Sequence, residues 1–296
     1  MRIVKVILGL LFLVLMAAMP MRLAQFLGKH LGRFWFKSKS SRSYKISKLN
    51  IDSCYCDTDV EYRDKLLAES LEHTGMSYAE MGMSWLWPSS WTLRKVISVE
   101  GLDVLDRAIA NDKGVIIIAP HIGNWEVLNL YASNLHPITV LYKQPKLKFF
   151  DWLINKMRKR LGGDMAPANA TGVRKLMKKL RAKGVIAILP DQEPAQGSGD
   201  FASFFGRKAY TMTLLSQLAS KTQCTVIAGV AIRQANGQGF AIKFTEVEVG
   251  INSRNTVDSI EVLNQSIETI VKQCPAQYQW EYKRFKKQPE GQSKLY

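Results

Sequence analysis

The chain has 296 residues, of which 47% are apolar and 22% are charged, so it can bury a hydrophobic core and is not a disordered protein. Lys and Arg outnumber Asp and Glu by 41 to 25, and the formal net charge of +16 favours an acidic partner: an anionic membrane, a nucleic acid or an acidic protein. The four cysteines (54, 56, 224 and 274) are too few for a disulfide framework and lack a completing zinc ligand set, so we expect reduced thiols and no metal.

The first 21 residues predict a membrane anchor. Val6 to Met19 form a run without charged side chains, behind a basic start. As a helix this run is about 21 Å long, short of the roughly 30 Å hydrocarbon core of a bilayer. Residues 22–48 contain many Lys and Arg and no acid, a flank that stays on the cytoplasmic side. This flank argues against a cleaved signal peptide, and we expect an uncleaved anchor that spans marginally or lies half-buried in the leaflet.

The segment 21–36 predicts an amphipathic helix at the membrane surface. Leu23, Phe26, Leu27, Leu31, Phe34 and Trp35 recur at helical spacing, with basic residues between them. A core-facing helix has the same periodicity and stays an alternative. Residues 40–60 indicate a polar connector or a loosely packed helix, and 62–87 indicate a helix that ends in an aromatic and Met-rich patch.

From about residue 100, strands alternate with helices, which predicts an α/β fold with a mainly parallel sheet flanked by helices. Strands 115–119 and 185–189 are apolar throughout, as strands covered on both faces should be. We expect strands at 114–120, 137–143, 184–190, 224–232 and 239–249, and helices at 124–135, 146–161, 172–184, 210–222 and 258–274. Residues 96–296 form the expected catalytic core and 22–95 a basic helical region, and 22–296 are expected to form one folded unit.

Two segments share one layout: "KGVIIIAPH" (113–121) and "KGVIAILPD" (183–191). Each has Lys-Gly, a short apolar strand, a proline and then a polar residue. Ligands of open α/β sheets bind beyond the carboxyl ends of the strands. The layout therefore delivers His121 and Asp191 to the functional edge of one sheet. Neither strand is followed by a glycine-rich phosphate loop, so a nucleotide cofactor is not expected.

The motif "PHIGNWE" (120–126) places Glu126 five positions after His121. In one continuous helix these residues lie about 140° apart. If His121 precedes the helix and Glu126 is in its first turns, the carboxylate can reach the imidazole and orient it as a general base. The alternative is a buried histidine with a purely structural role, whose ring forms a hydrogen bond with a neighbouring acid. Since no G-x-S-x-G elbow is present, the dyad would activate a substrate hydroxyl directly.

"PHIGNWE" resembles the histidine–acid signature of the glycerolipid and lysophospholipid acyltransferase superfamily, and more closely that of the bacterial lipid A late acyltransferases. "LPDQEP" (189–194), "FASFFGRKAYT" (201–211) and "PAQYQWEYKRFKKQPEG" (275–291) resemble further blocks of that family in the same order. The resemblance covers about residues 1–291. It implies acyl transfer from a thioester, typically acyl-acyl carrier protein, to a hydroxyl of a lipid A precursor, without a metal or other cofactor.

The resemblance also implies roles for single residues. His121 matches the general base and Glu126 its partner acid. Arg158 matches an arginine needed near the site, with a solvated basic cluster at 156–160 as the alternative. Asp191 matches the acid of a "DQ" block and either positions groups or caps a helix. Lys143 stands where many members carry arginine. Lysine keeps the positive charge but cannot form the two parallel hydrogen bonds that a guanidinium makes. Asn124, inside the motif, is a further substrate-binding candidate.

The implied location is the bacterial inner membrane, with the catalytic core on its cytoplasmic face. An acidic carrier protein, or coenzyme A in its place as acyl carrier, would meet a basic surface that includes residues 156–160. The nearest rival is acyl transfer to another lipid, such as a lysophospholipid, an aminolipid or another glycolipid. A nucleic-acid binder lacks any recognisable motif, and a non-catalytic scaffold would not need both His121 and Glu126.

Overall fold

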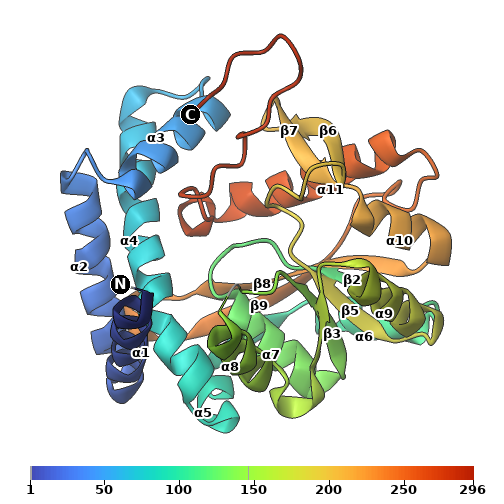
Figure 1. The fold of residues 1–296 in the computed structure, drawn as a ribbon, viewed down its shortest axis with the longest axis horizontal. Coiled ribbons are helices and arrows are strands. Elements are labelled where there is room, and N and C mark those ends of the chain that lie inside the picture. Colours follow the sequence, from blue (N-terminus) through green and yellow to red (C-terminus); the bar gives the residue numbers. More distant parts are fainter. Residues whose placement is uncertain (1, 146) are drawn as a thin grey trace.

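A computed structural model describes residues 2–145 and 147–296 of the protein, with side chains from residue 6 onward (Figure 1). The helices are α1 (Arg2–Ala18), α2 (Met21–Lys37), α3 (Arg42–Cys54), α4 (Val60–Leu86), α5 (Ser89–Leu93), α6 (Leu102–Ala110), α7 (Trp125–Leu135), α8 (Lys148–Arg158), α9 (Ala170–Arg181), α10 (Leu214–Thr222) and α11 (Thr256–Gln273). The strands are β1 (Val96–Glu100), β2 (Val115–Ile118), β3 (Ile138–Tyr142), β4 (Asp164–Pro167), β5 (Val185–Ile188), β6 (Gly199–Phe204), β7 (Arg207–Met212), β8 (Thr225–Arg233) and β9 (Phe240–Glu246).

The central sheet has seven strands in the order β1-β9-β8-β2-β5-β3-β4. All neighbouring pairs are parallel except β8 and β9, which are antiparallel. The predicted α/β fold with a mainly parallel, mixed sheet is therefore confirmed. A separate antiparallel hairpin pairs β6 with β7. In the middle of the sheet, β2 lies between β8 and β5, and both of its neighbours run in the same direction as β2.

Helices cover both faces of this sheet, which explains why β2 and β5 are apolar at every position. On one face, Ile116, Ile118, Ile186 and Ile188 pack in a core that also contains residues of α4, α9, α10 and α11. On the other face, Val115 and Ile117 pack against residues of α6 and α7. The alternation of side chains along each strand thus fills two cores, and the strand ends are left free to carry polar groups.

The N-terminal helices lie beside the sheet, with α2 packed along α4 (Figure 1). Glycines allow the close approach: a Cβ built on Gly28 would lie 2.5 Å from the carbonyl oxygen of Gly75. The expected apolar stripe of α2 faces outward, since Phe26 and Phe34 are 56% and 64% exposed. This excludes the core-facing alternative for these residues, because small side chains make the contact with α4 instead.

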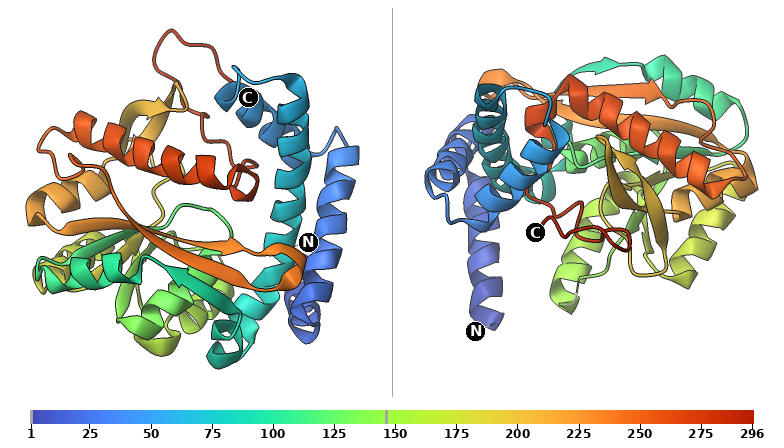
Figure 2. Two further views of the ribbon diagram at one scale, coloured as in Figure 1. Left: turned by 180° about the vertical axis from the view of Figure 1, so that it is seen from behind. Right: turned by 90° about the horizontal axis from the view of Figure 1, so that it is seen from above.

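Helix α1 projects from the rest of the molecule (Figure 2). Several of its large apolar side chains are exposed, Leu8 and Leu11 by about three fifths. No helix in the described part of the chain combines the length and the apolar character needed to cross a bilayer. Membrane anchoring of residues 1–21, and the division of the chain at residues 21 and 95, stay predictions.

Some segments differ from the expected elements. Residues 42–54, which were expected to be a connector or a loose helix, form α3 with Ile46 and Ile51 buried. Residues 210–212, expected in a helix, end strand β7, because the hairpin partner β6 supplies their hydrogen bonds. The sequence pattern had not indicated β1, α6, β4 or β6. All four cysteines are free thiols, as expected.

Candidate active site

His121 and Asp191 meet at the carboxyl edge of the sheet. Strands β2 and β5 pair in register, with Ile118 opposite Ile188, and each polar residue comes three positions later. The His121 backbone N–H donates to Asp191 Oδ2 (2.8 Å), and His121 Nδ1 lies 2.7 Å from Asp191 Oδ1. Among the described residues no helix begins at Asp191, so it is not a helix cap. The shared layout predicted that both residues reach one edge of the sheet, and the structure adds the contact between them.

The electrostatics of this pair bear on the protonation state of Asp191. Burial raises the pKa of Asp191, but the His121 imidazole and the hydrogen bonds from His121 outweigh burial and hold that pKa below its ordinary value. Asp191 is therefore an ionised acceptor, and Nδ1 of His121 must carry the proton that it receives. In the neutral tautomer with its proton on Nδ1, the other ring nitrogen, Nε2, has a free lone pair. The amide of Gln192 donates to Nε2 over 3.3 Å, a long contact that a substrate hydroxyl can replace.

Glu126 pairs with Arg158 and not with the imidazole. Both carboxylate oxygens accept from Arg158 Nε, at 3.1 and 3.0 Å, and Oε1 also accepts from Nη2. Burial lowers the pKa of Arg158, but the charge and hydrogen bonds of Glu126 outweigh it and raise that pKa. His121 thus contacts Asp191 and not, as expected, Glu126. Glu126 lies in the first turn of α7 and points toward the end of α8. Only tertiary packing brings the end of α8 to this position.

The turn 121–123 is held by the C-terminal block. Gly123 N donates to Gln277 O and Gln279 N donates to His121 O, each over 3.0 Å. Gly123 has a φ of +60°, and a Cβ there would lie 2.1 Å from the oxygen of Ala231. Only glycine fits a left-handed position this close to another backbone. The motif "PHIGNWE" therefore needs its glycine to turn His121 out of the strand.

Asn124 fixes the start of α7. Its side-chain oxygen accepts from Val127 N over 3.1 Å, and its amide nitrogen donates to Glu80 (3.0 Å) and to Ser84 (3.2 Å). An N-cap of this kind satisfies a helix N–H that has no partner within the helix. The side chain of Asn124 is fully engaged with the protein, which supports a structural role in place of the expected substrate contact.

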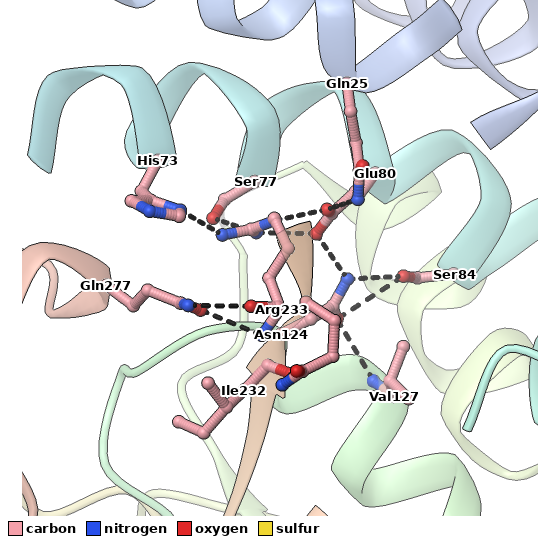
Figure 3. Close-up of polar contacts among 11 residues, drawn as sticks. Gln25, His73, Ser77, Glu80, Ser84, Asn124, Val127, Ile232, Arg233 and Gln277 are labelled. Atoms are coloured by element: carbon pink, nitrogen blue, oxygen red, sulfur yellow. Dashed lines mark hydrogen bonds and ion pairs between the residues drawn. The ribbon is translucent and has the colours of Figure 1, made fainter. Parts of the chain in front are cut away.

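Glu80 is the centre of a buried network that ties α2, α4, β8 and the active-site turn together (Figure 3). Its carboxylate is 0% exposed and accepts from Gln25 (2.6 Å), from Asn124 and from two nitrogens of Arg233. Arg233 also donates to Ser77 and to Nδ1 of His73. A glutamate in the Met-rich C-terminal part of α4 was a sign of this network in the sequence, and we had not predicted it.

The basic cluster 156–160 is not a continuous outer surface. Arg158 turns inward to Glu126, and Arg160 donates to the carbonyl oxygens of Ser84 and Trp87, each over 2.6 Å. Lys159, whose side chain is 49% exposed, lies 3.5 Å from Asp164, and Lys156 lies above the ring of Trp152. Arg158 and Arg160 thus contact groups within the protein, and docking of a carrier protein on residues 156–160 stays a prediction. Lys143 lies at the end of β3, exposed on a cavity wall.

Three cavities meet at Trp125. The α4-side cavity, of about 180 Å³, lies between α4, the turn 121–126 and residues 277–281. The open cavity, of about 1080 Å³, is bounded by α8, α9, the segment 189–198 and residues 279–287. An apolar pocket of about 30 Å³ lies between the sheet and α7. Trp125 lines all three, and His121 lines the first two.

This arrangement suits a base that acts between two reactants. An imidazole with an oriented, unprotonated Nε2 removes a proton from a hydroxyl, and two cavities give access to it from different sides. Within the described ranges, no group of three or more His, Cys, Asp or Glu is placed to hold a metal ion. Trp125, Gln192 and Gln279 are site residues that we had not singled out, although all three lie in the motif blocks of the sequence.

The comparison with family models gives a match over residues 1–287 to the family described as "Bacterial lipid A biosynthesis acyltransferase". The match therefore covers the N-terminal helices, the sheet and most of the C-terminal block.

Curated proteins of this kind are similar to the chain along most of its length. The lipid A biosynthesis palmitoleoyltransferase of Escherichia coli (strain K12) is 28% identical over 295 residues, which is 97% of this chain and 93% of that protein. The lipid A biosynthesis lauroyltransferase of the same organism is 25% identical and covers 96% and 91%. A lipid A biosynthesis acyltransferase of Haemophilus influenzae is 26% identical and covers 84% and 79%.

Proposed function

The chain belongs to the bacterial lipid A biosynthesis acyltransferase family, and from this premise we propose that it moves a fatty acyl chain from acyl-acyl carrier protein to a hydroxyl of a lipid A precursor. Its relatives are O-acyltransferases whose names specify different acyl groups, palmitoleoyl and lauroyl among them. Family membership therefore does not specify the acyl chain of this protein.

The observation that carries the proposal is the contact between His121 and Asp191. A buried, ionised Asp191 holds Nδ1–H of His121, which leaves Nε2 as a base at the junction of the cavities. Reaction between a thioester and an alcohol needs such a base and two routes of access.

In the proposed reaction, His121 Nε2 takes the proton of the acceptor hydroxyl as its oxygen attacks the thioester carbonyl carbon. Asp191 stabilises the imidazolium that forms. The tetrahedral intermediate collapses, the C–S bond breaks, and the thiolate takes the proton back from Nε2. The products are an ester and a free thiol, and the enzyme returns to its starting state without a covalent intermediate.

Arg158 and Glu126 complete the site. We assign Glu126 to holding the guanidinium of Arg158 at the wall of the open cavity, where its charge favours the negative oxygen of the intermediate. Lys143, on the same wall, is assigned to binding an anionic group of a substrate. Of the three cavities, only the open one has room for a long acyl chain, since the apolar pocket of about 30 Å³ holds about two water-sized groups.

The exposed apolar side chains of α1 and α2 support attachment to a membrane. Their basic neighbours suit anionic lipid, and the proposed location is the inner membrane with the sheet on its cytoplasmic side.

The test uses the purified full chain, radiolabelled acyl-acyl carrier protein or acyl-coenzyme A, and separate acceptors in detergent micelles. The acceptors are a lipid A precursor, a lysophospholipid, an aminolipid and a second glycolipid. Label should pass from the carrier-protein thioester to the lipid A precursor, and the His121→Ala variant should transfer none. Transfer only to another acceptor would support the rival lipid acyltransferase, and transfer by His121→Ala at the wild-type rate would contradict the mechanism.

A further inference from the structure

Within the proposed function, on which this inference rests, we propose that Gln192 is a further catalytic residue: its side-chain N–H donates to the negative oxygen of the tetrahedral intermediate, and Gln279 positions it. The two amides belong to a chain of hydrogen bonds that begins at the imidazole of His121 and ends at the buried carboxyl group of Glu281. Gln192 thereby adds a neutral donor to the charge that Arg158 provides at the same oxygen.

The side-chain amide of Gln192 presents its nitrogen, not its oxygen, to His121. In the neutral tautomer, with the Nδ1 proton held by Asp191, Nε2 of His121 is an acceptor and needs a donor opposite it. The Gln192 nitrogen lies 3.3 Å from Nε2, and it also donates to Oε1 of Gln279 over 2.9 Å. With one hydrogen given to Gln279, the other amide hydrogen is directed at the atom that takes the proton in the reaction.

Gln279 is held through both its backbone and its side chain. Its backbone N–H donates to the carbonyl oxygen of His121 over 3.0 Å, which places it beside the catalytic turn. Burial raises the pKa of Glu281, and hydrogen bonds from its own backbone and from the side chains of Thr74 and Gln279 oppose this rise. Because the amide nitrogen of Gln279 donates to Glu281, its amide oxygen is the end that faces Gln192.

The backbone around Gln192 is fixed as well. Before it, Asp191 accepts from the backbone N–H of His121 over 2.8 Å. After it, the N–H of Glu193 donates to the hydroxyl of Tyr282 over 2.9 Å. A donor stabilises an oxyanion well when it needs no rearrangement as the charge develops. A half-buried side chain whose amide and flanking backbone are both held meets this condition.

In the reaction, the N–H of Gln192 passes from the base to the substrate. Without substrate it faces the lone pair of His121 Nε2, over a distance that marks a weak hydrogen bond. An acceptor hydroxyl that donates to Nε2 takes this lone pair, and the N–H is left facing the adjoining thioester carbonyl. As the proton moves to Nε2, the new O–C bond forms and one electron pair of the carbonyl moves onto its oxygen.

The negative charge on this oxygen is what the N–H of Gln192 stabilises. The oxygen is attached to the carbon that the hydroxyl attacks, so it lies close to Nε2 and to the amide. When the C–S bond breaks, the electron pair returns to the carbonyl and the thiolate takes the proton from Nε2. A hydrogen bond that strengthens only as this charge develops raises kcat and leaves KM nearly unchanged.

The test uses the full chain in detergent micelles, with lauroyl-acyl carrier protein as donor and a lipid A precursor as acceptor. Single-turnover rates report the chemical step, and steady-state rates give KM for each substrate. Gln192→Met keeps the length of the side chain and removes its N–H, and should lower the single-turnover rate about 10²- to 10³-fold, with each KM within about threefold of the wild-type value.

Two further variants control for a folding defect. Gln192→Glu has the shape of glutamine and no amide hydrogen, so it should lose at least as much activity as Gln192→Met. Gln265→Met makes the same substitution at an exposed position of α11, outside the three cavities, and should keep the wild-type rate.

A double-mutant cycle tests whether Gln279 acts through Gln192. Gln279→Met leaves the amide of Gln192 without its orienting acceptor and should lower the single-turnover rate about tenfold, the effect of one hydrogen bond. Glu281→Gln removes the charged acceptor of Gln279 and should act in the same direction. Neither change should slow a protein that already carries Gln192→Met, because the donor that they position is absent.

Three results overturn the assignment while acyl transfer by the wild-type protein stands. They are a wild-type single-turnover rate for Gln192→Met and Gln192→Glu, a loss confined to the KM values, and additive losses when Gln279→Met is combined with Gln192→Met. If the wild-type protein transfers no acyl group to any acceptor, the proposed function itself fails.

Discussion

Replacement of Arg233 by Met tests the buried network. The Glu80 carboxylate is 0% exposed. Among the described residues it has four side-chain donors, of which Arg233 provides two and the only positive charge. Arg233→Met leaves the carboxyl group of Glu80 in the core with the two neutral donors of Gln25 and Asn124. Removal of one partner from a buried ion pair costs about 3–5 kcal/mol, which is a factor of roughly 150 to 5000 in the folding equilibrium.

The assay is chemical denaturation of the purified chain in detergent, followed by tryptophan fluorescence. Arg107→Met is the matched control, because its ion pairs with Asp103 and Glu246 are exposed and should contribute little. Glu80→Gln combined with Arg233→Met removes the stranded charge and should recover about 1–3 kcal/mol relative to Arg233→Met alone. If Arg233→Met lowers the free energy of unfolding no more than Arg107→Met does, the network does not stabilise the fold in the way described.

Three further predictions concern single residues. Asp191→Asn should lower kcat by about 10³-fold, because an amide no longer selects the Nδ1–H tautomer, and an unchanged steady-state rate would exclude Asp191 as the orienting group. His73 has a pKa of about 3 in the folded protein, compared with an ordinary value of 6.5. Between pH 3 and pH 6.5 the unfolded chain therefore binds more protons than the folded protein. Stability should fall by up to about 1.4 kcal/mol per pH unit as pH decreases from 6.5 toward 3, and His73→Gln should lack this component in pH-dependent denaturation. Gly28→Ala should cost about 1–3 kcal/mol in thermal or chemical unfolding because α2 and α4 must separate, whereas Gly9→Ala, with open space around it, should cost nothing.

The sheet and its functional edge were predictable because their signals are local. Strands such as β2 and β5 are covered on both faces and are apolar at every position, so they stand out from the helices. Each is followed by proline and a polar residue at the same offset, and parallel pairing in register brings His121 and Asp191 together.

The partners of the acidic residues were not predictable, because they depend on packing between distant segments. Glu126 lies close to His121 in sequence, yet the end of α8 brings Arg158 to it across 32 positions. Glu80 likewise meets Arg233 only after β8 is placed beside the turn. The same limit explains the hairpin: residues 210–212 have a helix-like neighbourhood, and only pairing with β6 makes them a strand.

Mass spectrometry of lipid A tests the central claim most directly, in cells with the protein, without it, and with the His121→Ala variant at equal abundance. The account predicts a lipid A precursor that gains the mass of one fatty acid less one water, only when the active protein is present. Identical lipid A masses in all three strains would contradict it.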